Sequence, residues 1–317
     1  MVKTLELANG MFVSMAVAEV TSVPFYELFA KDLDRANYSN QVLFTQILQA
    51  MHRKSDAENT AFEFLFQSIG VDNQTYKAQV RLYIIVRKIG DVKFSNESFI
   101  LDMMSSIKND LEDKNFSVSV LDTEEEYSSF EKALSETNCS KVLSISKKEK
   151  VIGNAISANG LMYYNDVIEP SENTNIATLT NALTQYPGSV VSMQIIPAKY
   201  NIQELYGIEE NKNFLAHYVS EIRYRQGIRV DANTQMIVDA YDYYSQANNE
   251  LLFLYNFVVY SEYSSAIDLA NKLMDAIETE GKATGSSLDI VDVSEFGLTP
   301  ATNLFASPWI ANDVLLN

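Results

Sequence analysis

Asn249-Glu250-Leu251-Leu252-Phe253-Leu254-Tyr255-Asn256-Phe257-Val258-Val259-Tyr260 forms an almost wholly apolar run. A short run of this kind predicts a buried β-strand, because apolar side chains occupy both of its faces. The next segment is amphipathic and can be capped by Ser264 and ended by Gly281, which predicts a helix. A β-like run at residues 288–293 follows. Residues 249–296 therefore predict a compact strand–helix–strand unit.

The same order of elements occurs earlier in the chain. Residues 79–89 are predicted to form a strand, residues 97–113 a helix, and residues 116–121 a returning strand. Residues 11–20 and the phenylalanine-rich residues 61–69 are two earlier predicted strands, with helical spacing of apolar residues between them. The resulting order is β-α-β-β-α-β. This order is typical of a ferredoxin-like fold, in which two helices cover one face of a four-stranded antiparallel sheet.

The second part of the chain repeats this order. Short β-like runs follow Lys141, residues 175–186 are predicted to form a helix, and residues 189–196 a strand, before the run that begins at Asn249. We therefore predict an α+β protein made of two tandem ferredoxin-like domains. The first comprises residues 1–138 and the second residues 139–317.

The second half differs from the first by an insertion at about residues 201–248, where the first half has only a short turn. Phe214, Tyr218 and Ile222 follow helical spacing, and a second helix is predicted around Ile237. The insertion is therefore predicted to be a helical hairpin, which either contacts a partner or covers the open face of the sheet. The side chains predicted for a partner interface are Tyr218, Ile222, Arg223, Arg225, Arg229, Tyr241 and Tyr244.

Burial of both faces of the strand at residues 251–260 requires a second cover, because a ferredoxin-like unit has helices on one face only. The insertion hairpin, the sheet of the first half and an adjacent subunit are the alternatives. The corresponding strand at residues 79–89 carries Arg81 and Arg87 on one face, which predicts a wetter surface. The acidic residues 124–136 predict a solvated helix that joins the halves.

Composition limits the classes of function. The chain has 24 basic and 42 acidic residues and a net charge of -18, which argues against neutralising a phosphate backbone as its main role. Residues 223–229 contain the densest basic patch, and a helix end or protein–protein salt bridges explain it better than base stacking. Cys139 is the single cysteine, which excludes an internal disulfide and favours the cytoplasm. No apolar run approaches the roughly 18–20 residues of a membrane-spanning helix.

No catalytic motif is recognisable. The two histidines, His52 and His217, have no second ligand at metal-binding spacing. Gly281-Lys282-Ala283 lacks the upstream glycine and the hydroxyl of a phosphate-binding loop, and the lone cysteine has no nearby base. We therefore predict no catalytic residue, no cofactor and no metal, and a protein that is not an enzyme. An enzyme with dispersed acid–base residues stays open, since ferredoxin-like sheets carry many chemistries.

Four features of residues 140–317 carry a resemblance to a known family. They are the strand Val190-Val191-Ser192-Met193-Gln194-Ile195-Ile196-Pro197, the helical insertion, the strand at residues 251–260 with its following helix, and a tail from about residue 297. This outline resembles the region in front of the motor domain in HerA-type and conjugative (type IV secretion) ATPases. In that family a hexameric motor couples ATP hydrolysis to DNA or protein translocation, and the preceding domains mediate assembly and docking.

The resemblance implies a non-catalytic assembly domain that associates with itself or with a protein partner, and it covers no part of the motor. An alternative comes from a different class. Paired ferredoxin-like domains also suit a stand-alone ligand-binding protein, or a structural assembly protein of phage or secretion type.

Overall fold

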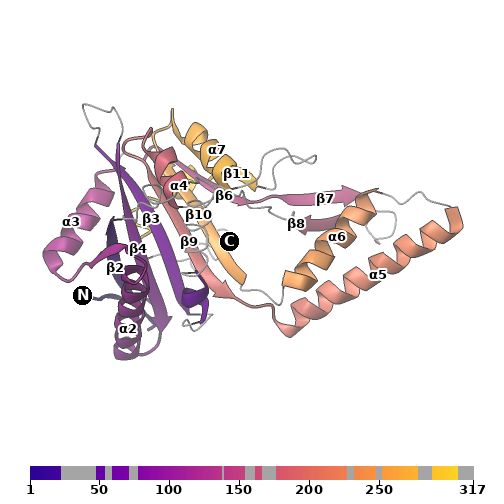
Figure 1. Cartoon of the computed structure of the whole chain (residues 1–317), viewed down its shortest axis with the longest axis horizontal. Helices are drawn as coiled ribbons and strands as arrows, with labels where there is room; N and C mark the ends of the chain where they lie inside the picture. Colours follow the sequence, from indigo (N-terminus) through magenta and orange to yellow (C-terminus); the bar gives the residue numbers. More distant parts are fainter. Residues whose placement is uncertain are drawn as a thin grey trace.

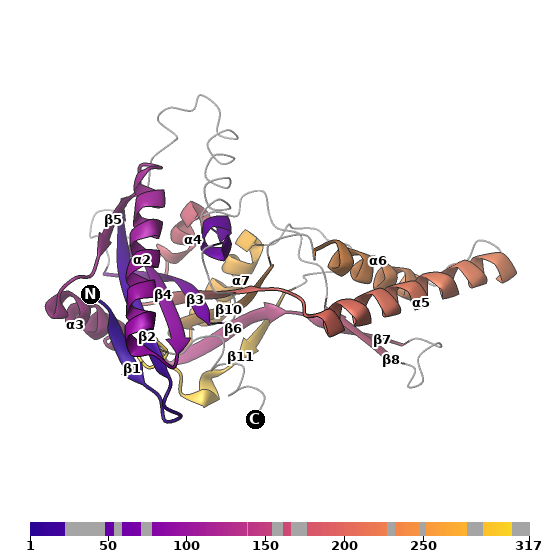
Figure 2. The ribbon, with the colours of Figure 1, turned by 90° about the horizontal axis from the view of Figure 1, so that it is seen from below.

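The structure is a computed structural model, and it describes residues 1–22, 48–53, 59–70, 78–137, 139–153, 161–165, 176–226, 232–247, 252–277 and 288–305. The side chains of residues 149–177, 218–234 and 247 lie outside this description. The fold is α+β, as predicted, and is built on one nine-stranded antiparallel sheet. Helices lie on both faces of the sheet, and a helical arm projects from it (Figures 1 and 2).

The order of strands in the sheet is β1-β2-β4-β3-β9-β10-β6-β11, and β5 also pairs with β2. Residues 1–138 contribute β1 to β5, and residues 139–317 contribute the other four. Each of these strands was predicted, apart from the short β1. Their bounds are β1 (Lys3–Glu6), β2 (Phe12–Ser22), β3 (Thr60–Ile69), β4 (Gln79–Gly90), β5 (Ser117–Val120), β6 (Lys141–Lys147), β9 (Val190–Ala198), β10 (Leu252–Ser261) and β11 (Leu288–Asp292).

Strands β3 and β9 join the two halves of the sheet. They pair antiparallel, with Phe62 opposite Ile195 and Gln67 opposite Val190. The strands of both predicted domains therefore lie in one continuous sheet. Hydrophobic periodicity identifies strands but carries no information on which edges pair, so the pairing of β3 with β9 was not predictable from it.

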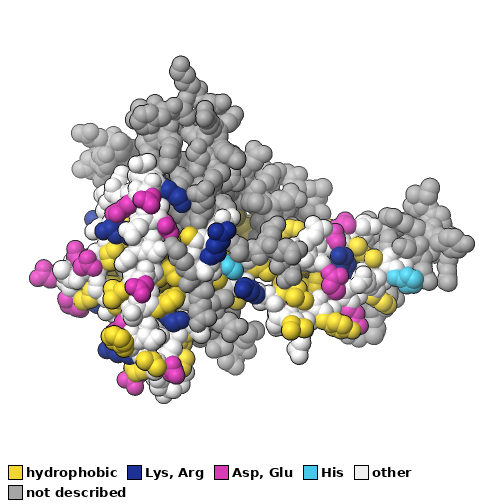
Figure 3. All heavy atoms as spheres, turned by 60° about the horizontal axis from the view of Figure 1, so that its bottom comes forward, with side chains coloured by type: hydrophobic (Ala, Val, Ile, Leu, Met, Phe, Trp, Pro, Cys, Tyr) yellow, Lys and Arg dark blue, Asp and Glu magenta, His cyan; other side chains and the backbone are white. Residues whose placement is uncertain are grey.

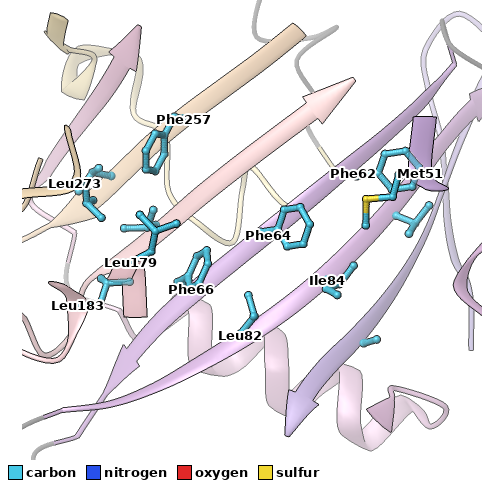
Figure 4. Close-up of a cluster of buried hydrophobic side chains, with 14 of the residues drawn as sticks. Met51, Phe62, Phe64, Phe66, Leu82, Ile84, Leu179, Leu183, Phe257 and Leu273 are labelled. Atoms are coloured by element: carbon cyan, nitrogen blue, oxygen red, sulfur yellow. The ribbon is translucent and has the colours of Figure 1, made fainter. Parts of the chain in front are cut away.

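One face of the sheet is covered by helices α2 (Lys93–Glu112), α4 (Ile176–Leu183) and α7 (Ala266–Ile277). Residues 48–53 are also helical and place Met51 in the same core. Phenylalanines from β3 fill the middle of this core, as Figure 4 shows. The labelled side chains there are Met51, Phe62, Phe64, Phe66, Leu82, Ile84, Leu179, Leu183, Phe257 and Leu273. On β3 these phenylalanines alternate with Glu63, Leu65 and Gln67, so a spacing of two residues places all three on one face of the strand.

The opposite face is covered by helix α3 (Glu124–Ser135) and the C-terminal segment, residues 293–305. The prediction that α3 is a solvated linker was wrong for one of its faces, because Tyr127, Phe130 and Leu134 are buried against the sheet. The glutamates lie in the first turn, where they suit the helix dipole, and Thr123 and Glu126 form a capping box. The acidic run therefore begins the helix and leaves its inner face apolar.

The prediction of a wet second face on β4 holds at Arg81, whose side chain is 42% exposed, and was wrong for the rest of that face. Tyr83, Ile85 and Arg87 are all buried there. The ring of Tyr83 contacts that of Phe130 on α3, with centroids 4.7 Å apart. The stem of an arginine can lie in an apolar layer when its charge is paired, and Arg87 has such a partner in Glu63 on β3.

Strand β10 is buried on both faces only at its C-terminal end. Phe257 and Val259 belong to the core under the helices, and Val258 and Tyr260 to the core on the opposite face. Nearer its start, Leu254 is 53% exposed, which corrects the prediction of a strand buried throughout. The C-terminal segment covers the second face at Val258 and Tyr260, so none of the three predicted covers applies there.

The insertion is a helical hairpin, as predicted. It consists of α5 (Ile202–Gln226) and α6 (Ala232–Ala247), which leave the sheet between β9 and β10. Strands β7 (Glu149–Gly153) and β8 (Leu161–Asn165) form a separate two-stranded sheet next to α6. Figure 1 shows α6 between α5 and this small sheet, with α5 at the outer edge of the arm.

Candidate functional site

The helical arm has a small core of its own. Leu215 from α5 packs with Ile237 and Ala240 from α6, and all three are buried. Tyr241 and Tyr244 lie at the edge of this cluster. Each helix of the arm thus buries an apolar face against the other. Among the described residues, the arm contributes no side chain to either core of the large sheet.

Polar contacts fix the two helices of the arm relative to each other. Lys212 on α5 forms an ion pair with Asp242 on α6, at an Nζ–Oδ1 distance of 2.9 Å. This hydrogen bond raises the pKa of Lys212, and the hydroxyl of Ser245 donates to Glu209 beside it. Exposed contacts of this kind contribute little stability, but they set the register of the helices.

Helix α5 begins at a well-defined point. The amide N–H of Glu204 donates to Asn201 Oδ1 over 2.9 Å, and that of Asn201 donates to Glu204 Oε2 over 2.7 Å. This reciprocal pair satisfies two amide groups at the helix start.

At the base of the arm, the ring of His52 stacks edge-on against Phe253, and its Nε2 lies 3.4 Å from the carbonyl oxygen of Ala198. The arm therefore starts from an ordered junction.

The outer face of α5 carries a stripe of exposed apolar side chains, which we call the α5 stripe. Its described members are Ile202, Tyr206 and Phe214, which are 86%, 68% and 55% exposed. They share a four-residue spacing, and Glu210 occupies the intervening position. The stripe faces away from α6, whose contact is made through Leu215, and Figure 3 shows hydrophobic side chains along the arm. Exposed large apolar side chains gathered on one helix face mark a contact surface.

The predicted interface residues fall into two groups. Tyr241 and Tyr244 lie half-buried on α6, where their rings meet at a centroid distance of 6.2 Å, so they also support the arm's own core. Burial raises the pKa of Tyr241. Four residues lie on α5 but their side chains are outside the description, and Arg229 is outside the described residues altogether. Those four are Tyr218, Ile222, Arg223 and Arg225.

Sequence reasoning missed Ile202 and Tyr206. The signal was present, because both positions continue the four-residue spacing backwards from Phe214. Phe214 itself was expected on the apolar face of the helix, whereas Leu215 is the residue that packs inward.

A second cluster lies at the centre of the sheet's opposite face. Arg87 Nη2 donates to Glu63, which also accepts from the hydroxyl of Ser192 on β9. The two charged side chains are 0% and 4% exposed. No described residue accepts a hydrogen bond from Arg87 Nη1. A buried pair of this kind is a structural element that joins β4, β3 and β9. It lies across the β3–β9 pairing, which we call the seam between the two halves of the sheet.

The C-terminal segment is tied to this face by polar contacts as well as by apolar packing. Arg87 Nε donates to the carbonyl oxygen of Leu304 over 2.6 Å, and Asn303 Nδ2 donates to the hydroxyl of Tyr260 over 2.9 Å. Burial raises the pKa of Tyr260, so this hydroxyl stays protonated at neutral pH. Leu298, Ala301 and Phe305 pack against the same core.

Two observations on the described residues concern metal binding and nucleophilic chemistry. They contain no cluster of His, Cys, Asp and Glu that could hold a metal ion. Burial raises the pKa of Cys139 to about 12, and the thiolate form that acts as a nucleophile is therefore disfavoured. Among the same residues, no helix combines the length and the apolar character needed to cross a bilayer.

No protein-family model matches the chain, and no curated protein matches its sequence.

Proposed function

We propose that this chain is a non-catalytic assembly and docking domain, of the kind that precedes the motor in HerA-type and conjugative DNA- or protein-translocating ATPases. The helical arm supports the proposal most directly. It stands away from the sheet, holds itself together through its own core, and exposes the α5 stripe. A fold that needed the hairpin only for stability would turn that stripe inward.

We also infer that the sheet consists of two ferredoxin-like units, residues 1–138 and residues 139–317. The strand orders β5-β2-β4-β3 and β11-β6-β10-β9 support this inference. When the four strands of each unit are numbered along the chain, both units place them side by side in the order fourth, first, third, second. The arm then occupies the link between the second and third strands of the second unit. Two stable units fused edge to edge provide a rigid base for a projecting arm.

The C-terminal segment supports a role in positioning a following domain. Residues 298–305 are held on the sheet by Arg87, Tyr260 and the surrounding apolar side chains. Any segment beyond Phe305 therefore starts from a fixed place. The single cysteine and the absence of recognisable catalytic motifs agree with a cytoplasmic, non-catalytic domain.

The test uses the complete product of the reading frame that contains this chain. We expect that frame to continue into a domain with a Gly-Lys-Ser/Thr phosphate-binding loop, and the whole protein to assemble as measured by mass photometry. Replacing residues 202–247 by a short Gly-Asn turn should leave the circular dichroism of the sheet intact and reduce assembly. Phe94→Asp is the matched control, because Phe94 is a large exposed apolar residue on α2, outside the arm. Unchanged assembly after the replacement would contradict the docking role.

A further inference from the structure

Four cationic side chains gather where the helical arm leaves the sheet. They are Arg53, Lys147, Lys148 and Lys199, which we call the arm-base cations, and all four are exposed. We propose that they form a docking site for a short acidic segment of a partner protein. This inference rests on the proposed docking function and names the chemistry of the partner.

The topology of the sheet brings the three lysines together. Strands β6 and β9 lie on either side of β10 and both pair antiparallel with it, so they run in the same direction and finish at the same end of the sheet. Lys147 is the last residue of β6, Lys148 follows it, and Lys199 comes directly after the end of β9. Two strand spacings, about 10 Å, separate β6 from β9. The lysines therefore flank the start of β10.

Arg53 joins the lysines from the first half of the chain. The Nε2 atom of His52 lies 3.4 Å from the carbonyl oxygen of Ala198, and its ring contacts Phe253. These contacts place the neighbouring Arg53 close to the residue that precedes Lys199. In Figure 3, dark blue Lys and Arg side chains border the cyan histidine at the junction of the sheet and the arm.

The arm-base cations are not neutralised within the part of the chain that the structure describes. None of the four side chains forms an ion pair or a hydrogen bond there. Partial burial lowers the pKa of Lys147, and no neighbouring carboxylate raises it. Glu204, at the start of α5, already accepts the amide N–H of Asn201. Most other described Lys and Arg side chains form ion pairs, namely Lys3, Arg81, Arg87, Lys93, Lys108, Lys132, Lys141, Lys212 and Lys272.

Exposed apolar side chains lie among the cations. Continuing the register of β10 with β6 places Tyr255 opposite Lys147 and Leu254 opposite Lys148, on the two faces of the sheet. Tyr255 is 36% exposed and Leu254 is 53% exposed. In protein–protein contacts, large apolar side chains contribute affinity and the surrounding charges contribute specificity. A matching partner segment therefore carries carboxylates together with an aromatic or aliphatic side chain.

The net charge of the chain selects among anionic partners. Nucleic acid is negative along its whole length, so the charge of -18 repels it everywhere except at the cluster. A second copy of the chain carries the same -18 and is repelled as a whole. A short acidic segment carries few charges, and most of them can lie against the arm-base cations. The local attraction then acts within the screening distance of about 8–10 Å, beyond which salt weakens the repulsion.

Fluorescence anisotropy tests the site with a short fluorescein-labelled peptide of glutamate and leucine residues. The same peptide with glutamine in place of glutamate is the control probe. We expect the unmodified chain to bind only the acidic peptide, and more weakly as the salt concentration rises. Lys147→Gln combined with Lys199→Gln should weaken binding about tenfold or more. Lys93→Gln combined with Lys108→Gln is the matched variant. It removes the same amount of charge from exposed lysines of α2, away from the arm, and should leave the affinity unchanged.

Carbodiimide coupling of the acidic peptide locates the contact independently, because it joins carboxylates to nearby lysine amines. Mass spectrometry should find the peptide on Lys147, Lys148 or Lys199. Equal loss of affinity in the two double variants, or coupling mainly to Lys93 and Lys108, would overturn the site. Tighter binding of a labelled thymidine oligonucleotide than of the peptide would overturn the choice of partner in favour of nucleic acid. Self-association in sedimentation that the Lys147→Gln, Lys199→Gln variant abolishes would overturn it in favour of a second copy.

Replacing residues 202–247 removes none of the arm-base cations, which separates this inference from the proposed function. If the acidic peptide does not bind the unmodified chain while the replacement still reduces assembly, the docking function stands and the acidic partner is wrong. If the peptide binds through the cations while the replacement leaves assembly intact, the docking role of the arm is wrong and the anion-binding surface stands.

Discussion

Arg87 on β4 binds the main-chain carbonyl of Leu304, with 2.6 Å between Nε and the oxygen, although the two residues lie far apart in the sequence. The centre of the sheet's second face is therefore bonded to the C-terminal segment. The same guanidinium pairs with Glu63 on the neighbouring strand, next to the seam at which the two halves of the sheet meet. One side chain thus links the first half, the seam and the tail.

Arg87→Met should destabilise the protein by about 3–5 kcal/mol, because it leaves the carboxylate of Glu63 buried and unpaired. Urea unfolding followed by circular dichroism measures the loss. The double variant Arg87→Met with Glu63→Leu should recover most of it, since it removes both charges from the apolar layer. A single variant as stable as the unmodified protein would show that the pair is dispensable.

Val258→Asp should unfold the second half. The residue is buried on β10, and an unpaired carboxylate there loses its hydration without gaining a partner, which costs several kcal/mol. Leu254→Asp is the matched control, because Leu254 lies on the same face of the same strand and is exposed. We expect the control to melt within a few degrees of the unmodified protein. Ile84→Asp on β4 should have the same effect on the first half as Val258→Asp has on the second.

Tyr127→Phe should cost about 1–3 kcal/mol of stability. The hydroxyl of Tyr127 accepts a hydrogen bond from the amide of Val17 over 3.1 Å and donates to the carbonyl of Met1 over 3.0 Å. Its removal leaves a buried amide without its acceptor. Thermal melts should show the loss for this variant and none for Tyr263→Phe, whose side chain is exposed. Equal melts for both variants would exclude α3 as an anchor of β2.

Cys139 should react slowly with a thiol reagent in the folded protein at pH 8. Burial raises its pKa to about 12, so the reactive thiolate is scarce, and the rate should keep rising with pH well beyond that of an ordinary thiol. In denaturant the rate should increase to that of an exposed cysteine. A fast reaction in native buffer would place the thiol at the surface.

The helices and strands of the fold were largely predictable, because apolar runs and the spacing of apolar residues can be read directly from the sequence. The segments that cover each face of the sheet were less predictable. Arg87 made β4 appear wet, and its burial is explained by its pairing with Glu63 on β3 and its hydrogen bond to the carbonyl of Leu304. Glutamates made α3 appear solvated, although Tyr127, Phe130 and Leu134 already had the spacing of a buried face.

The surface of the arm was half predictable for a similar reason. Helical spacing located the hairpin and the buried Ile237 and Ala240. It could not distinguish Phe214 from Leu215 as the inward residue, because both are apolar neighbours and the choice depends on how α6 packs. The α5 stripe became visible only once one face of the helix was assigned to α6.

The seam between β3 and β9 has a consequence for how such a molecule can change over time. In a dimer of two identical chains paired along these strands, every substitution would occur in both halves, once on each side of the two-fold axis. Because both edges of the seam belong to one polypeptide, each side is free to vary alone. The link between β9 and β10 carries the arm, whereas β3 and β4 are joined by residues 70–78 alone. A fused pair can thus carry a single projection on an otherwise balanced base.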